Sequence, residues 1–378
     1  MRNLWSIRAK VAVKSLYARS LLSQSSKPTL KYRFTVPQRN HDPEIVQRLM
    51  AAYQAALENQ KVAKFPTPGV DLWDHILSND LLQFRDALAA GDLQFIQSFM
   101  PNIGRDYTWF GGLSLGIDGY TPVEFRQSEI ALLYWEKMVA LAESQGVLNC
   151  ENPESGPYLK NIHVNPRDLI LKMQSELGID IAPPDDILPT FGFIADERVY
   201  HYRHINSLYA AAQCRHYLKP GASVIEIGAG LGLSCLYARR FQPLDYSIYD
   251  LPLTCFISGF FLMNALGKDQ VCLFGETPNR DAVKILPYWS IADLADGAVD
   301  LALNQDGLPE IDDITVQFLL RNIERCVNDK FYSFNHEVFG LRRVSTFVAQ
   351  HTGFKRLSRG RNWVREGYVD ELYAKDWQ

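Results

Sequence analysis

Residues 224–234 read Val-Ile-Glu-Ile-Gly-Ala-Gly-Leu-Gly-Leu-Ser, and this stretch decides the fold class. A short, apolar, β-branched run ends in three glycines at alternate positions, Gly228, Gly230 and Gly232. Glycines let the backbone turn tightly and let a ligand approach without a Cβ in the way. The stretch therefore predicts a buried strand, a ligand-binding turn and the start of a helix.

The same alternation of short apolar runs and helical periods continues around this stretch. Runs typical of buried strands lie at 247–249, 271–274, 299–303 and 331–334. Helical patterns fill the gaps at 205–217, 233–240, 253–266, 291–296 and 311–325. Strands that alternate with helices predict an α/β fold whose parallel sheet is covered on both faces.

The first half of the chain has helical spacing and no strong catalytic motif. Helical patterns cover 41–59, 71–77, 80–90, 93–100, 122–145 and 167–177. Glycines at 110–120 predict a loop, and prolines at 183–189 mark a linker. We therefore expect three parts: a basic tail at 1–40, a mostly helical region at 41–190 and the α/β domain at 191–378.

Length, composition and charge restrict the class of protein further. The 378 residues are 47% apolar and 22% charged, which supplies a core and excludes a disordered chain. No run reaches the roughly 18 apolar residues that span a bilayer. The net charge of −4 argues against a nucleic-acid partner. The six cysteines are scattered singly, as is typical of a reducing compartment, so we expect a cytoplasmic protein.

The charge is unevenly distributed along the chain. Residues 1–40 hold nine basic side chains and no acidic one, whereas 41–378 hold 30 basic and 43 acidic side chains, a net charge of −13. A transit peptide has this composition, and so does a basic segment that rests on an anionic membrane or an acidic partner. A solvated extension is the third reading. The tail thus leaves a peripheral membrane contact open.

The spacing of the glycines discriminates between two nucleotide ligands. A dinucleotide site would place its third small residue at position 233, which is Leu. Glu226 lies two residues before Gly228 and would disfavour a pyrophosphate, whereas it suits the cationic methionine end of S-adenosylmethionine (SAM). Asp250, at the end of the next strand, can accept hydrogen bonds from a ribose diol in either ligand. Turn glycines and a helix N-cap are the plain structural readings.

At this point the sequence resembles a known family. The segments 224–232, 246–252, 299–311, 331–335 and 367–373 are similar to those of Rossmann-like SAM-dependent methyltransferases, and among these to the putative sugar O-methyltransferases of bacterial polysaccharide gene clusters. The resemblance is good over about 200–378, looser over 70–200 and absent over 1–40. The family often carries Ser where this chain has Gly307.

The resemblance implies a SAM-methyltransferase sheet with flanking helices at 191–378, and methyl transfer to a sugar hydroxyl in polysaccharide or glycolipid biosynthesis. Gly228, Gly230 and Gly232 would lie under the methionine part of SAM, supported by Glu226, while Asp250 would bind the ribose. Asn304, in the matching segment after the fourth strand, would also belong to the cofactor site. A sugar or glycan acceptor is the implied partner.

Methyl transfer to a hydroxyl also needs a group that takes the proton of the acceptor. The ends of the fourth and fifth strands offer His336, Glu310 and Asp306, with Glu337 beside them. Their plain readings are a loop histidine, an acid that serves a helix dipole and a turn residue. In an alternative version Asp306, with Asn335 or Glu337, holds a Mg²⁺ ion that grips two vicinal sugar hydroxyls.

Two further segments combine rings with basic side chains. Residues 198–204 contain four rings and two arginines and read as a lid or acceptor-site wall, or as a plain helix entrance. The arginine-rich stretch 356–365 reads as a contact for an anionic acceptor or as a solvated edge hairpin.

Two rival functions stay open on the sequence. A nicotinamide-dependent sugar oxidoreductase or epimerase would use a Tyr-x-x-x-Lys pair, and no Tyr of this chain has a Lys four residues on. A non-catalytic SAM-fold scaffold is the other rival, and the intact glycine turn with Asp250 argues against it.

Overall fold

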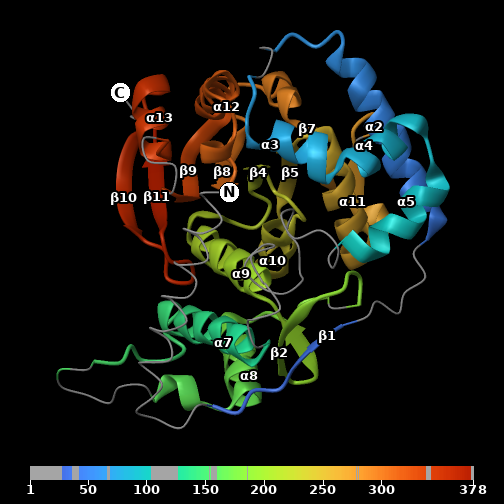
Figure 1. The fold of residues 1–378 in the computed structure, drawn as a ribbon. Coiled ribbons are helices and arrows are strands. Elements are labelled where there is room, and N and C mark those ends of the chain that lie inside the picture. Colours follow the sequence, from blue (N-terminus) through green and yellow to red (C-terminus); the bar gives the residue numbers. More distant parts are fainter. Residues whose placement is uncertain are drawn as a thin grey trace, which may run out of the picture. The chain divides into compact units, whose positions relative to one another are not determined.

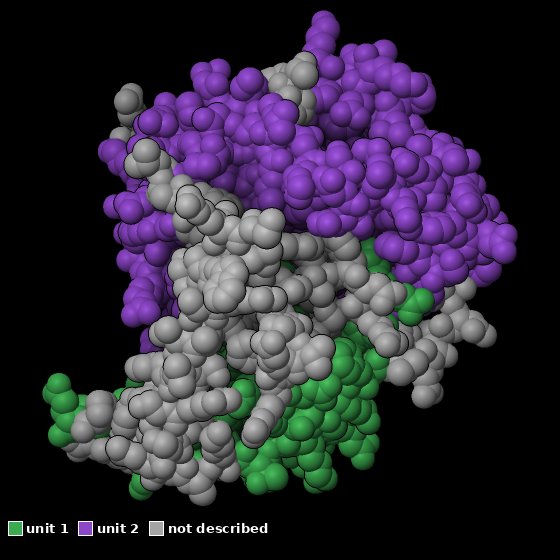
Figure 2. All heavy atoms as spheres, viewed as in Figure 1, with its two compact units in different colours: residues 1–38, 102–206 green, residues 39–101, 207–378 purple. Residues whose placement is uncertain are grey.

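A computed structural model describes residues 28–35, 42–65, 69–103, 127–152, 154, 160–184, 186–277, 279, 281–337 and 342–375. The chain forms two compact units, coloured separately in Figure 2. Unit 1 comprises residues 1–38 and 102–206, and unit 2 comprises residues 39–101 and 207–378. The segment expected as one helical region at 41–190 is thus divided between both units.

Unit 2 is built on an eight-stranded sheet (Figure 1). Its strands are β4 (Ser223–Ile227), β5 (Asp245–Asp250), β6 (Val271–Leu273), β7 (Val283–Pro287), β8 (Val299–Gln305), β9 (Val327–His336), β10 (Lys355–Arg361) and β11 (Tyr368–Ala374). The spatial order is β10-β11-β9-β8-β4-β5-β7-β6. The pairs from β6 to β9 are parallel, while β11 runs antiparallel to both of its neighbours.

The parallel part has the strand order of a doubly wound fold. Numbered along the chain without the edge strand β6, the strands β4, β5, β7, β8 and β9 take the order 3-2-1-4-5. The order reverses between β4 and β8, and ligands of such sheets bind outside the carboxyl ends of the strands at this point. The expected Rossmann-like α/β fold is confirmed, and the glycine turn after β4 lies at the switch point.

Around this sheet lie α10 (Leu233–Phe241), α11 (Pro252–Leu266), α12 (Asp313–Cys326) and α13 (Val344–His351), with the short 3-10 turns η6 (Tyr288–Asp293) and η7 (Leu308–Glu310). Three of these helices, α10, α11 and α12, agree closely with the predicted ranges, whereas α13 was not predicted. Apolar side chains of α12 and α13 form one buried cluster with Ile225, Ala302 and Phe331 of the sheet. Ile225 therefore lies on the face of β4 that these helices cover. Because successive side chains of a strand point to opposite faces, Glu226 lies on the other face, where α10 packs.

One strand of the parallel sheet escaped prediction. The expected third strand, 271–274, is the edge strand β6, while the strand between β5 and β6 is β7. Five residues with Lys284 in second place give a weak strand pattern, but Lys284 forms an ion pair with Asp245 of the adjacent strand. The helix expected at 291–296 is replaced by η6. The sheet is also not wholly parallel, because the β10–β11 hairpin extends it past β9.

The first helices of unit 2 cover one end of the sheet. They are α2 (Pro43–Gln60), α3 (Leu72–His75), α4 (Leu82–Ala90) and α5 (Leu93–Phe99), and the turn Ile76–Asp80 is π-helical. Helix α2 packs along α11, as Figure 1 shows, with Leu49 of α2 directly against Gly259 of α11. Arg48 of α2 binds Glu276 near β6 at 2.7 Å and fixes the same seam.

Unit 1 combines helices with a small antiparallel sheet. The helices are α7 (Gln127–Ser144) and α8 (Pro166–Leu177), and the strands are β1 (Tyr32–Phe34), β2 (Phe191–Ala195) and β3 (Arg198–Tyr200). Strand β1 pairs with β2 from Tyr32 opposite Phe193 to Phe34 opposite Phe191. Part of the expected tail is therefore a strand; residues 1–27 lie outside the described part. The glycine-rich stretch 110–120 lies outside it as well.

Helix α9 (Tyr202–Cys214) belongs to both units, since the boundary falls within it. Within the described ranges, every helix is too short or too polar to cross a bilayer.

Candidate active site

The turn after β4 has the backbone of a ligand-binding loop. Gly228, Gly230 and Gly232 all have left-handed conformations, with φ of 71°, 59° and 78°. A Cβ on Gly232 would lie 2.7 Å from Leu262 of α11, so this glycine permits close packing. Among the described residues, no atom would lie within 4 Å of a Cβ on Gly230, so this part of the chain leaves the centre of the turn open to a ligand.

Asp250 ends β5 directly beside this turn. Its Oδ2 accepts a hydrogen bond from the Gly230 amide at 3.2 Å, and its Oδ1 accepts one from the Leu251 amide at 2.8 Å. Burial raises the pKa of Asp250 to about 7, and these two amides counteract the shift. The carboxylate is thus positioned over the open centre of the glycine turn, as a ribose ligand requires.

Glu226 is buried inside the sheet and does not line the turn. Glu226 is only 1% exposed, and its Oε2 accepts a hydrogen bond from the Tyr246 hydroxyl at 2.7 Å. Burial raises its pKa to about 7, while bonds from Tyr246 and Ser234 lower it. Since Ser234 lies in the first turn of α10, Glu226 ties the strand to that helix. Its observed contacts are those of a support for the loop.

Asn304 connects three adjacent strand ends. Its Nδ2 donates to the carbonyl of Ile227 at 2.9 Å, and its Oδ1 accepts from Asn335 at 2.8 Å. Asn335 also donates to Ser333 Oγ at 2.8 Å. Asn304 is fully buried. These amides hold the carboxyl ends of β4, β8 and β9 in register, which places Asn304 beneath the expected cofactor site.

Gly307 brings the loop after β8 against the glycine turn. A Cβ on Gly307 would lie 3.0 Å from Asn304 Nδ2 and 3.9 Å from the Cα of Gly228. The loop approaches closely because this position has no side chain. The glycine at this position therefore has a packing reason in this chain.

His336 and Glu310 form a pair at the same edge of the sheet. His336 is the last residue of β9, and Glu310 ends the turn η7 that begins just after Gly307. The His336 Nε2 lies 3.1 Å from Glu310 Oε1, and the two side chains are 6% and 19% exposed. Burial raises the pKa of Glu310, and the bond to His336 opposes the rise. Two of the three predicted catalytic residues thus come together.

Asp306 lies close by but has a different partner. It accepts a hydrogen bond from Arg365, whose guanidinium also donates to the Tyr368 hydroxyl at 2.5 Å. The Tyr368 ring meets the His336 ring edge to face, with centroids 5.5 Å apart. Asp306 is therefore engaged in an ion pair rather than placed as a base. The sequence did not single out Arg365 or Tyr368 as individual site residues, although the 356–365 stretch and the matching segment 367–373 contain them.

The oxygen groups proposed for magnesium do not converge. Asp306 binds Arg365, Asn335 binds Asn304, and Glu337 Oε1 accepts from Arg359 at 2.8 Å. Across the described ranges, no three His, Cys, Asp or Glu side chains gather as metal ligands would. The residues named for a magnesium site thus do not fit one in this arrangement.

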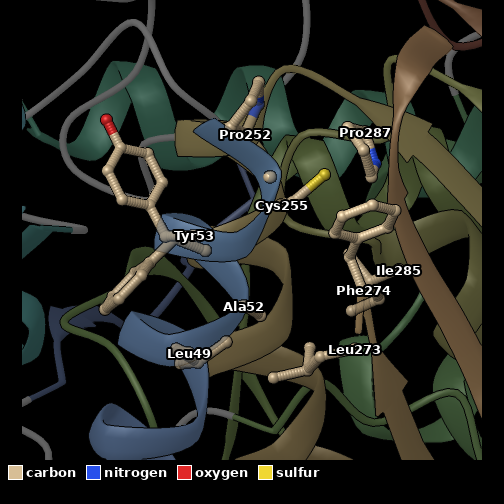
Figure 3. A pocket seen from close by; sticks show the side chains of 11 residues that line it. Leu49, Ala52, Tyr53, Pro252, Cys255, Leu273, Phe274, Ile285 and Pro287 are labelled. Atoms are coloured by element: carbon tan, nitrogen blue, oxygen red, sulfur yellow. The ribbon is translucent and has the colours of Figure 1, made fainter. Parts of the chain in front are cut away.

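A small apolar cavity lies between helices α2 and α11 and the strands β6 and β7 (Figure 3). Helix α2 contributes Leu49 and Tyr53 to its wall, and Pro252 and Cys255 of α11 face them. Its volume of about 20 Å³ suits one water molecule. The Cys255 thiol donates to the Leu286 carbonyl at 3.2 Å. The cavity is a packing gap near Asp250 and does not offer room for a substrate.

The ring-rich segment 198–204 is packed inside rather than presented as a wall. Tyr200, His201, Tyr202 and His204 are all buried. The Tyr134 hydroxyl lies 3.2 Å from His201 Nε2, and the Arg203 amide donates to His201 Nδ1 at 3.1 Å. These contacts favour the reading of this segment as a helix entrance.

Several solved structures are similar to part of this chain. No family model and no curated protein matches the chain. Among solved structures, the mitomycin 7-O-methyltransferase MmcR is 17% identical over 46% of this chain and 56% of its own, with a TM-score of 0.33. A geranyl diphosphate C-methyltransferase from Streptomyces coelicolor is 12% identical over 44% of this chain and 79% of its own, with a TM-score of 0.33.

A third similar structure is named as a cyclase rather than a methyltransferase. The cyclase SpnF is 13% identical over 48% of this chain and 84% of its own, with a TM-score of 0.36. This chain therefore spans little more than half of MmcR and most of the other two proteins.

Proposed function

We propose that this protein is a SAM-dependent O-methyltransferase that methylates a sugar hydroxyl. One observation carries the proposal. The glycine turn with Asp250 and the His336–Glu310 pair both lie at the carboxyl ends of the parallel strands of one sheet. Gly307, three residues before Glu310, packs against Gly228 and joins the two groups. A binding loop and a proton acceptor at one crevice are what transfer to a hydroxyl needs.

The residues of the turn fit SAM better than a dinucleotide. The open position over Gly230 can receive the methionine part, and the two Asp250 oxygens have lone pairs for ribose hydroxyls. A pyrophosphate would sit beside the Asp250 carboxylate and would need the small residue that Leu233 replaces. SAM, when bound, supplies an electrophilic methyl group.

The proposed base is His336, oriented by Glu310. The His336 Nε2 lies 3.1 Å from Glu310 Oε1, and the imidazole would take the proton of the acceptor hydroxyl. The imidazolium formed would be stabilised by the Glu310 carboxylate. A base is needed for a hydroxyl acceptor because the alcohol pKa is far above neutral, so the pair favours O-methylation.

The sugar acceptor rests on the sequence resemblance over 200–378 to putative sugar O-methyltransferases. A product in polysaccharide or glycolipid assembly, a cytoplasmic location and a contact of the basic tail with a membrane or a partner belong to the same proposal. The direct test incubates the protein with isotope-labelled SAM and extracts of nucleotide-sugars, oligosaccharides and glycolipids, followed by mass spectrometry. The proposal expects label in a carbohydrate; label only in other classes would contradict the sugar assignment.

The proposed base predicts a specific pattern of variants. His336→Ala and Glu310→Gln should each lower kcat by roughly 10²- to 10⁴-fold while SAM binding stays near wild type, because neither side chain belongs to the glycine turn. His75→Gln, which changes an exposed histidine of α3, should retain wild-type turnover. Near-normal kcat in His336→Ala would remove His336 from the role of base.

A further inference from the structure

Arg365 links the loop between β10 and β11 to the catalytic pair. This loop joins the two strands of the edge hairpin, and the Arg365 side chain within it is only 12% exposed. Its guanidinium binds Asp306 on one side and donates to the Tyr368 hydroxyl on the other. The guanidinium also stacks on the Tyr368 ring, 3.5 Å from the centroid.

Asp306 is the strained residue of the site. It has a φ of 71°, which is the left-handed region that L-residues rarely adopt. Its amide donates to the Phe334 carbonyl of β9 at 3.2 Å, and its carboxylate binds Arg365. This conformation sends the chain from β8 into η7, which places Glu310 opposite His336. Strain of this kind persists where the surroundings fix it, and it gathers at functional sites.

Tyr368 supports the other half of the pair. It begins β11 and lies opposite His336 in the β9–β11 ladder. The edge-to-face contact between the two rings restricts the orientation of the imidazole. Arg365 therefore holds one residue on each side of the pair: Asp306 on the Glu310 side and Tyr368 on the His336 side.

We infer that Arg365 is a positioning residue for the His336–Glu310 pair, acting through Asp306 and Tyr368. The inference rests on the proposed function for its catalytic meaning, but the contacts stand without it. It assigns a role to a residue of the hairpin through its contacts with Asp306 and Tyr368. It also gives Asp306 a supporting role in place of a catalytic one.

Charges around Glu310 give the inference a measurable consequence. Asp306 raises the pKa of Glu310, whereas His336 and Arg365 lower it. Arg342 contacts the adjacent Pro309 carbonyl at 3.1 Å and is the other cation on this turn. Loss of the Arg365 charge removes a group that lowers the pKa of Glu310 and takes away the cation that pairs with Asp306. Glu310 should then hold its proton to a higher pH.

The test compares R365Q and R365K with R359Q in the full-length protein. Arg359 is a matched control in the same hairpin, because its guanidinium binds Glu337 and Glu371 instead of Asp306. In R365Q we expect kcat to fall roughly 10- to 100-fold and the acid limb of its pH profile to move up by roughly one unit, with KM for SAM unchanged. R365K should restore the position of the acid limb but only part of kcat, because the lysine ammonium lacks the planar guanidinium that contacts Asp306 and Tyr368 together. R359Q should behave like wild type.

A second readout does not depend on turnover. The ¹³C carboxyl resonance of Glu310, assigned by its loss in E310Q, should titrate at higher pH in R365Q than in wild type or R359Q. If this shift is present while no acceptor is methylated, the proposed function fails and the positioning role stands. If R365Q titrates and turns over like wild type, or if R359Q reproduces its effects, the inference is overturned.

Circular dichroism and the melting temperature show whether each variant folds. Should R365Q fail to fold, R365K and Y368F decide the matter. Y368F removes only the hydroxyl that accepts from Arg365 and keeps the ring against His336, so a several-fold loss of kcat is expected. Wild-type kcat and titration in both of these variants would overturn the inference equally.

Discussion

Gly307 shows how a missing side chain shapes the site. A Cβ at this position would press on the Asn304 amide at 3.0 Å, and that amide holds the strand end from which the glycine turn begins. Asn304 has no room to yield, because it is fully buried between Ile227 and Asn335. Close approach of two loops thus depends on one residue type.

Gly307→Ala should therefore weaken SAM binding by roughly tenfold and destabilise the fold by about 1–2 kcal/mol, because it displaces the Asn304 amide from its partners. Gly360→Ala in β10 is the matched control, since a Cβ there meets no atom of the described residues within 4 Å. Calorimetric titration and thermal melts measure both effects. Equal behaviour of the two variants would refute the packing role given to Gly307.

The residues of the site were predictable in type more than in role. The glycines, Asp250, His336 and Glu310 follow from their places at strand ends, because parallel strands bring these ends to one edge. The engagement of Asp306 by Arg365 was not predictable, since 59 residues separate them and only the antiparallel return of β11 brings them together. Glu226 shows the same limit: its Tyr246 partner depends on strand register.

At the scale of elements, α2 and α11 form the seam that closes one side of unit 2. Gly259 lies in the middle of α11, where Ala would ordinarily favour the helix. Here a Cβ would lie 2.4 Å from Leu49 Cδ2 of α2. Packing between two helices that are distant in the sequence thus outweighs local propensity.

Gly259→Ala should lower the free energy of unfolding by about 1–3 kcal/mol through overpacking of this seam. The double variant Leu49→Ala with Gly259→Ala should be less destabilised than the sum of the two single changes, because the first makes room for the second. Denaturant unfolding measures all three. Strict additivity would contradict direct contact between the two positions.

Long apolar patterns were predictable, and some short strands were not. Helices α2 and α11 match their predicted ranges within two residues, because α2 repeats its apolar positions at helical spacing and α11 is an apolar run too long for a strand. The missed strand β7 has five residues with a charge at its second position, and β1 has three residues. Tyr32 and Phe34 alternate with basic residues, which was the available signal for β1 in the expected tail.

At the scale of the whole molecule, buried acids tie stability to pH. Burial raises the pKa of Glu226 and Asp250 to about 7 and that of Asp370 to about 6. A carboxyl whose pKa is higher in the folded than in the unfolded state binds its proton more tightly when folded. Its contribution to stability is complete below the unfolded value and is lost as pH rises to the folded value.

The titration of Glu226 should therefore lower the stability of the wild-type protein as the pH rises from about 4.5 to about 7. Glu226→Gln keeps an acceptor for the Tyr246 hydroxyl without a titrating group. We expect it to gain on the order of 2 kcal/mol relative to wild type above pH 7 and nothing near pH 4.5. Unfolding by urea at several pH values measures the difference. A variant with the wild-type pH dependence would contradict the buried, protonated state of Glu226.

The most direct test of the account is equilibrium binding at the glycine turn. Isothermal titration calorimetry should show binding of S-adenosylhomocysteine and none of NAD⁺. Asp250→Ala should weaken that binding by roughly 1.5–3 kcal/mol through the loss of charge-assisted hydrogen bonds. Asp245→Ala, at the other end of the same strand, should leave it unchanged. Binding of NAD⁺ without S-adenosylhomocysteine, or wild-type affinity in Asp250→Ala, would contradict the central claim.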